Sequence, residues 1–131
     1  MNTERAPFPC YIPVAAATAG NAADIFAVSP FLGKSKVARI DYVSDGGVTA
    51  NNTNYATFTA TVAGTTIGTM TTEITGSGDI ADGAVESLTL TAAGSNLVAE
   101  GGVVKVAITK AASGVAIAGT VSVVFERVAA D

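Results

Sequence analysis

The stretch Ala56-Thr57-Phe58-Thr59-Ala60-Thr61-Val62 decides the fold of this chain, because apolar residues alternate with threonine there without a break. A period of two places every second side chain on one face of an extended strand, whereas helical spacing would scatter the threonines around all faces. A short turn containing Gly64 follows, and the segment 66–71 has the composition of a hairpin partner. The sequence therefore predicts a half-buried β-hairpin over residues 56–71.

Further short strands extend in both directions from this hairpin. They are expected over residues 24–28, 37–43, 86–91, 97–98, 103–109 and 120–127. In the second of these, Ala38, Ile40 and Tyr42 are expected on the core face, with Arg39 and Asp41 on the other. The expected core residues of the last two strands are Val104, Val106, Ile108, Val121, Val123 and Phe125.

The spacing of the turn signals is typical of a β-sandwich, and no amphipathic helix stands out. We therefore expect an all-β fold, an antiparallel two-sheet sandwich, over residues 21–131. A jelly-roll strand order is the first expectation and an immunoglobulin-like order is the alternative.

Residues 1–20 differ in composition from the rest, because Pro7, Pro9 and Pro13 interleave with Phe8, Tyr11 and Ile12. Proline fixes φ, lacks a backbone donor and biases the preceding residue toward extended geometry. The segment is therefore expected to be an extended, Pro-rich N-terminal arm. It either reaches a partner or forms an edge strand of its own domain.

The composition favours a structural or binding protein over an enzyme. The 131 residues contain no His and no Trp, which removes the commonest general base and metal ligand, and the single cysteine, Cys10, is expected to be a free, buried thiol. Asp79, Asp82 and Glu86 lack the spacing of an EF-hand, and the segment 33–35 lacks the leading glycine and following helix of a phosphate-binding loop. We expect no catalytic residues, no metal and no cofactor.

Charge and hydropathy indicate which classes of partner this protein is expected to have. The net charge is -4 and the seven basic residues are scattered, so nucleic acid is not an expected partner. No stretch approaches the roughly 20 apolar residues of a membrane helix, and no secretory leader is visible, so we expect cytoplasmic synthesis and no membrane association. Charged residues are 14% of the chain, against about 25% in an average domain. Identical copies or a larger assembly are therefore expected to cover part of this surface.

The strand-and-turn pattern resembles the capsid decoration, or cement, proteins of tailed bacteriophages, a family of small β-sandwich virion proteins. The segments that carry the resemblance are 24–31, 37–43, 48–55, 88–90, 97–102, 103–109 and 119–125. Where relatives often have Gly-Asp before the strand at 103, this chain has Gly101-Gly102, a departure confined to a turn.

The resemblance implies a homotrimer on the exterior of a capsid that binds across neighbouring major capsid subunits. The expected shell-contact residues lie in the N-terminal segment: Pro7, Phe8, Pro9, Tyr11 and Ile12. Two alternatives stay open. A receptor- or glycan-binding module of a phage fibre would need an exposed aromatic cluster, for which Tyr42 and Tyr55 are the available residues. An adhesion or pilus-like subunit would need a secretion signal.

Overall fold

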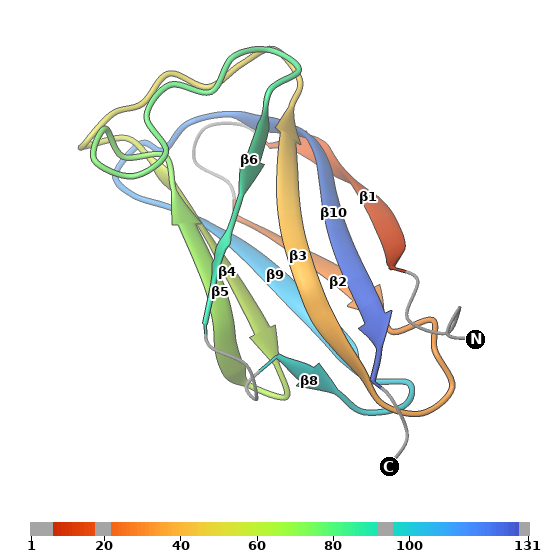
Figure 1. The fold of residues 1–131 in the computed structure, drawn as a ribbon. Helices are drawn as coiled ribbons and strands as arrows, with labels where there is room; N and C mark the ends of the chain where they lie inside the picture. Colours follow the sequence, from red (N-terminus) through yellow and green to blue (C-terminus); the bar gives the residue numbers. More distant parts are fainter. Residues whose placement is uncertain (1–6, 18–21, 92–95, 129–131) are drawn as a thin grey trace.

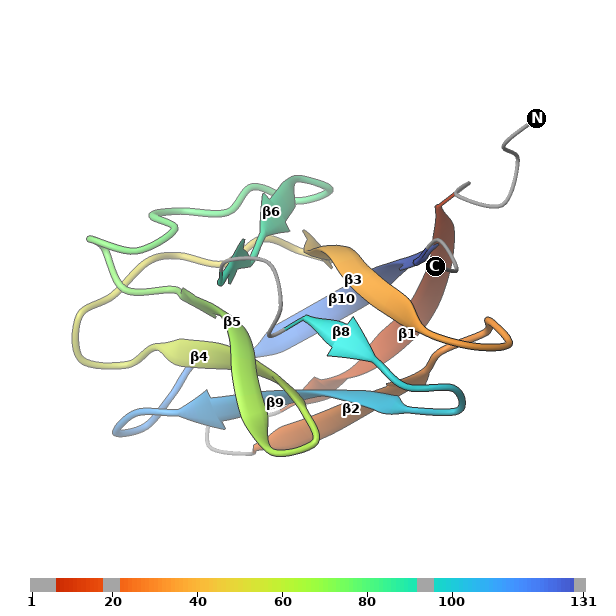
Figure 2. The same cartoon turned by 60° about the horizontal axis from the view of Figure 1, so that its bottom comes forward.

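The computed structural model describes residues 7–17, 22–91 and 96–128. The described residues form two antiparallel β-sheets packed face to face (Figures 1 and 2) and no helix. The predicted all-β, antiparallel two-sheet sandwich is thus confirmed.

The first sheet has the strand order β1-β10-β3-β6, with the short strand β8 also paired to β3. Its strands are β1 (Phe8–Ala17), β3 (Ser35–Ser44), β6 (Val85–Ser87), β8 (Leu97–Val98) and β10 (Ile117–Arg127). β6 pairs with one end of β3 and β8 with the other, so two short segments share one edge. In Figure 1 the long strands of this sheet lie toward the viewer.

The second sheet has the strand order β2-β9-β4-β5-β7. Its strands are β2 (Ala23–Val28), β4 (Ala56–Val62), β5 (Thr65–Thr71), β7 (Thr89–Leu90) and β9 (Val103–Lys110). The chain therefore passes between the two sheets repeatedly, and each sheet collects strands that are distant in the sequence (Figure 2).

The β4–β5 hairpin forms as its sequence pattern predicts. Side chains of β4 alternate between buried and half-buried along its whole length, with the threonines on the outer face. Val62 pairs with Thr65 around Ala63 (φ 50°) and Gly64 (φ 83°). Positive φ at both central residues is what a type I′ hairpin turn requires, and its twist matches that of the strands.

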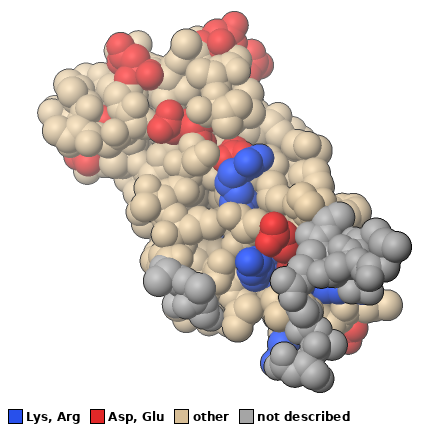
Figure 3. Space-filling view, in the orientation of Figure 1, with Lys and Arg blue, Asp and Glu red and all other residues tan. Residues whose placement is uncertain are grey.

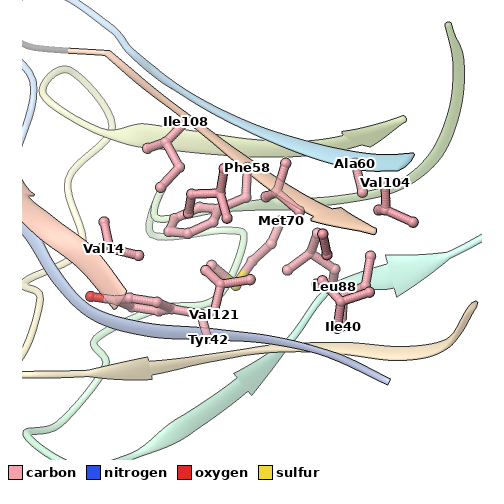
Figure 4. Packing of buried hydrophobic residues seen from close by; sticks show 14 of the residues in the cluster. Val14, Ile40, Tyr42, Phe58, Ala60, Met70, Leu88, Val104, Ile108 and Val121 are labelled. Atoms are coloured by element: carbon pink, nitrogen blue, oxygen red, sulfur yellow. The ribbon is translucent and has the colours of Figure 1, made fainter. Parts of the chain in front are cut away.

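The core lies between the sheets and is built from the inward residues of both (Figure 4). Tyr42 of β3 and Phe58 of β4 face each other from opposite sheets, with ring centroids 5.0 Å apart, and both are fully buried. The six core residues expected from the last two strands are also buried. Full burial of each large apolar side chain contributes about 1.5–3 kcal/mol, so the core holds the two sheets together.

Two details of the predicted strands are wrong. Ala38 is exposed, and Val37 is buried in its place, because β3 and β10 shift register between Val124 and Phe125. An extra residue in one strand turns the following side chains to the other face, so strict alternation fails at such a bulge. The predicted strand 86–91 is two strands: β6 belongs to the first sheet, β7 to the second, and the buried Leu88 lies between them.

The N-terminal segment takes the second of its two expected forms. Residues 8–17 are extended but pair along their length with β10, so β1 is the edge strand of the first sheet. Proline is confined to such edges, with its nitrogen turned away from the ladder. Within the described residues, this segment is part of the sandwich and not a separate arm. Residues 1–6 and 18–20 of the predicted arm lie outside the described residues.

Candidate functional site

A shallow groove crosses the outer face of the first sheet, where neighbouring strands place their outward side chains in rows. Pro9 of β1, Val124 of β10 and Arg39 of β3 are paired across the sheet, and Tyr11, Ser122 and Asp41 form the next row. We call this feature the outer-face groove; it has a volume of about 310 Å³. Its lining residues are Pro7, Pro9, Tyr11, Arg39, Asp41, Val43, Val85, Ser122 and Val124.

An ion pair between Arg39 and Asp41 lies in the outer-face groove. Arg39 Nε donates to Asp41 Oδ2 at 2.7 Å, and Ser87 Oγ donates to Asp41 Oδ1 at 2.6 Å. The Asp41 side chain is 9% exposed, whereas that of Arg39 is 64% exposed. Because both carboxylate oxygens are engaged, Asp41 holds the guanidinium in place. Arg39 remains able to meet a partner.

The structure divides the five expected contact residues between two faces. Pro7, Pro9 and Tyr11 line the outer-face groove, and Tyr11 is 70% exposed. Ile12 packs against the core. Phe8 lies against Phe31 in an edge-to-face contact, with ring centroids 6.2 Å apart. Three of the five therefore share one surface, since odd and even residues of a strand point to opposite faces.

Most residues of the groove were missed by sequence reasoning. The missed residues are Arg39, Asp41, Val43, Val85, Ser122 and Val124. The alternation of residues 37–43 and 120–127 could have indicated which side chains face outward. It could not indicate that these strands lie beside β1, because strand neighbours are set by contacts distant in the sequence.

The face that carries the groove has two ion pairs near its middle, Arg39 with Asp41 and Lys36 with Glu126, and is otherwise mostly uncharged (Figure 3). Acidic residues gather at the end of the molecule where the loops after β3 and β5 meet, in the orientation of Figure 1. Two of these carboxylates have a structural role: Asp82 Oδ1 accepts from the Gly46 amide, and Asp79 Oδ1 accepts from the Ala50 amide, both at 2.8 Å. They join two loops, as Asp does commonly in turns.

A second, larger concavity lies beyond the short strand β7, which pairs with only Gly68 and Thr69 of β5. We call it the edge cleft; its volume is about 530 Å³. Its lining residues are Tyr55, Thr57, Thr69, Met70, Thr71, Glu73, Gly76, Ser77, Glu86, Ser87 and Thr89. Within the described chain, neither Glu73 nor Glu86 has an ion-pair partner. The cleft is therefore acidic and rich in hydroxyl groups.

The two tyrosines considered for a glycan site have different environments. Tyr55 is half-buried and lines the edge cleft. Tyr42 is wholly buried, and its hydroxyl donates to the Ala118 carbonyl at 2.6 Å. Burial raises the pKa of Tyr42, so its hydroxyl stays protonated as a donor. Tyr42 is thus a core residue, as its place on the core face of the predicted strand 37–43 indicated, and of the two tyrosines only Tyr55 is available to a glycan-binding site.

The described residues include one thiol, that of Cys10. Cys10 is half-buried and unpaired, and burial raises the pKa of its thiol, which lowers the fraction of reactive thiolate. Within 7–17, 22–91 and 96–128, no three His, Cys, Asp or Glu side chains come close enough to hold a metal ion. The same residues include no helix of the length and apolarity needed to cross a membrane.

Comparisons with models of protein families, with curated proteins and with solved structures found no match to this chain.

Proposed function

We propose that this protein is a non-enzymatic structural protein that decorates and stabilises the outer surface of a tailed-phage capsid, binding across the major capsid subunits. The observation that carries the proposal is the outer-face groove, which brings Pro7, Pro9 and Tyr11 together with Arg39 on a largely uncharged face. Such a surface combines a rigid aromatic anchor with a guanidinium, the residue types most enriched at the centres of protein interfaces.

The location proposed for the protein follows from this role: it is made in the host cytoplasm and ends on the capsid exterior. Many equivalent sites on a shell would make a modest groove sufficient, because linked contacts strengthen one another. The homotrimer implied by the resemblance stays a prediction.

The strand order supports the jelly-roll arrangement that we expect for this sandwich. β10 lies between β1 and β3, and β9 lies between β2 and β4. The last two long strands thus return to the middle of the two sheets, beside the first strands. A strand that returns by a long connection to lie beside the first is the mark of a Greek key, and a jelly roll contains two of them.

A matched pair of tyrosine variants tests the proposed function. Tyr11→Ala removes the exposed ring of the outer-face groove, and Tyr55→Ala removes the ring of the separate edge cleft. Each variant is mixed with purified undecorated capsids, and the bound fraction is measured after sedimentation. We expect at least a tenfold weaker affinity for Tyr11→Ala, as is usual for a central aromatic contact, and little change for Tyr55→Ala.

The point variant is preferable to deletion of residues 1–13, which would also remove the first part of β1 and expose the edge of β10. Wild-type protein that does not bind capsids would refute the proposed role. Binding that is unaffected by Tyr11→Ala would refute the groove as its site.

The edge cleft favours one alternative, a glycan-binding attachment module. Tyr55 offers a ring for stacking on a sugar, and Glu73 and Glu86 are free to accept hydrogen bonds from its hydroxyls. NMR titration with a panel of neutral saccharides tests this directly. Shifts confined to the cleft and abolished by Tyr55→Ala would support the alternative, and no shift at millimolar sugar would exclude it.

A further inference from the structure

Three of the four edges of the two sheets are protected against pairing with another strand. The free edge of β1 has prolines at positions 9 and 13, which cannot donate to a new ladder. The outer edge of β3 is occupied by the short strands β6 and β8, and between them Leu88 N donates to Ile40 O at 2.9 Å. These are standard devices by which proteins block edge-to-edge association.

The outer edge of β5 is protected in the same way. β7 pairs with Gly68 and Thr69, and Thr91 N donates to Ile67 O at 2.8 Å. Further along the strand, Ser77 N donates to Thr71 O at 2.9 Å. Short segments therefore occupy the backbone groups of this edge along most of its length.

β2 forms the fourth edge and has none of these devices. Its six residues, Ala23–Val28, contain no proline and pair only with β9. Apart from that ladder, no other described residue makes a hydrogen bond with the β2 backbone. β1, the neighbouring edge of the first sheet, lies close to β2 but does not pair with it. Alternate N–H and C=O groups of β2 thus point away from the sheet, ready for another strand.

The side chains of β2 also favour contact with a partner, because several of them are apolar and exposed. Phe26 is 58% exposed and Val28 is 56% exposed on the outer face, and Val103 of β9, paired with Val28, is 41% exposed. The single charge of the strand, Asp24, lies near its start and is 3.6 Å from Lys105 Nζ. Lys105, the partner of Phe26 in β9, lies beside this apolar strip and is held in the ion pair with Asp24. Exposed apolar side chains therefore follow an open ladder, the combination that marks a site of strand addition.

We propose that β2 is an interface with a second copy of this chain, in which two β2 strands pair antiparallel about a two-fold axis. The feature that favours a second copy is the central position of the exposed Phe26, whose ring meets its own equivalent in a two-fold antiparallel pairing. When Phe26 faces its own equivalent, Ile25 faces Ala27, and Asp24 faces Val28. Every pair then keeps core residues on the core side and outward residues on the outer side, as continuous sheets require.

The pairing joins two five-stranded sheets into one of ten strands. It brings the two Phe26 rings together on the outer face and separates the two Asp24 carboxylates, which lie at opposite ends of the new ladder. Aromatic pairs directly across an antiparallel ladder are stabilising. An isologous contact of this kind closes after two copies, because it uses the β2 edge of both and leaves neither open. The proposal does not depend on the proposed function, and it predicts a dimer where the resemblance implies a trimer.

Charge substitutions at the centre of the interface test it. The mass of the full chain is measured by light scattering on a sizing column at tens of micromolar, with twice 12.9 kDa expected for the wild type. Phe26→Lys and Phe26→Glu each place like charges opposite each other, and each should weaken the dimer at least about tenfold, giving a monomer. An equal mixture of the two variants should restore a dimer through the opposite charges. Leu32→Lys, at an 81% exposed apolar residue outside the strand, is the matched control and should stay dimeric.

Cross-linking fixes the register. With Cys10 replaced by serine, Phe26→Cys should form a covalent dimer on mild oxidation, because residues directly opposite in an antiparallel ladder are close enough for a disulfide. Leu32→Cys in the same background should not. A monomeric wild type would overturn the proposal, and so would an oligomer whose mass is unchanged by Phe26→Lys.

Discussion

Substitution of Gly119 by alanine should destabilise the sandwich more than any other single methyl group added to a glycine. Gly119 lies in β10 between β1 and β3, paired with Val14 on one side and Ser44 on the other, and has φ +138°. A Cβ atom there would overlap the carbonyl oxygen of Val43 and lie 3.0 Å from the Val43 carbonyl carbon. The backbone of a central strand cannot move away without disturbing the strands on both sides.

The size of the effect follows from two contributions. Holding a non-glycine residue at this φ costs about 1–3 kcal/mol. Moving β10 away from Val43 would also weaken one or two ladder hydrogen bonds, each contributing about 1 kcal/mol, including the bond of 2.9 Å from Asp45 N to Ala118 O. Together these give a loss of about 2–5 kcal/mol, a large part of the 5–15 kcal/mol that a domain typically has.

Gly64→Ala is the matched control, because Gly64 also has positive φ (+83°) but an added Cβ would meet no atom within 4 Å. Its cost should be about 1 kcal/mol, from the backbone conformation alone. Urea unfolding followed by far-UV circular dichroism measures both free energies of unfolding, since the chain has no Trp. If the free energies of unfolding of the two variants differ by less than about 1 kcal/mol, then the close packing of β10 on β3 does not add to the cost of Gly119→Ala.

Two further predictions concern the core. Phe58→Ala should cost about 3–5 kcal/mol in urea unfolding, because it leaves a cavity between the sheets, whereas Thr59→Ala on the outer face should cost less than about 0.5 kcal/mol. Tyr42→Phe should cost only about 1 kcal/mol at neutral pH, because the Ala118 carbonyl keeps its bond from the Asp45 amide. Burial raises the folded-state pKa of Tyr42 above the ordinary tyrosine value of 10.0, so this stabilisation is complete below pH 10 and is lost as pH rises through the folded pKa. The free energy of unfolding of Tyr42→Phe should therefore fall less steeply above pH 10 than that of the wild type; equal slopes would contradict this. Lys110, whose pKa burial lowers, has the opposite effect but is common to both proteins.

Local alternation predicted the strands well where one face is core and the other solvent. Residues 56–62 alternate in sequence and in burial alike, because β4 itself is regular: its pairing with β5 shifts register between Ala60 and Thr61, but the extra residue belongs to β5. Alternation failed at Ala38, where the register shift lies in the pairing of β3 with β10. Composition around Ala38 has no sign of that shift, since it depends on the partner strand.

Prediction of the surfaces was limited in the same way. Tyr11 and Pro9 were expected at an interface because the N-terminal segment combines prolines with exposed aromatic residues. They lie on one face because they are two residues apart in the same strand. That Arg39 lies in the same groove follows from the order β1-β10-β3, which joins segments about 30 and 85 residues apart along the chain. The edge cleft likewise exists because the segment 85–90 changes sheets at Leu88, which no local pattern indicated.

The two proposed surfaces are on different sheets, and their geometry makes them compatible. A two-fold axis through the paired β2 strands runs perpendicular to the second sheet, and the first sheet is stacked on the second. Rotation about an axis perpendicular to both layers leaves the outer face of the first sheet pointing in the same direction in each copy. The two outer-face grooves of a dimer would thus face one side together and could contact a single shell at two points. Two linked contacts bind far more tightly than one when their spacing fits the target. Loss of the β2 contact should then weaken capsid binding although the groove is intact, whereas Tyr11→Ala should weaken it although the dimer is intact.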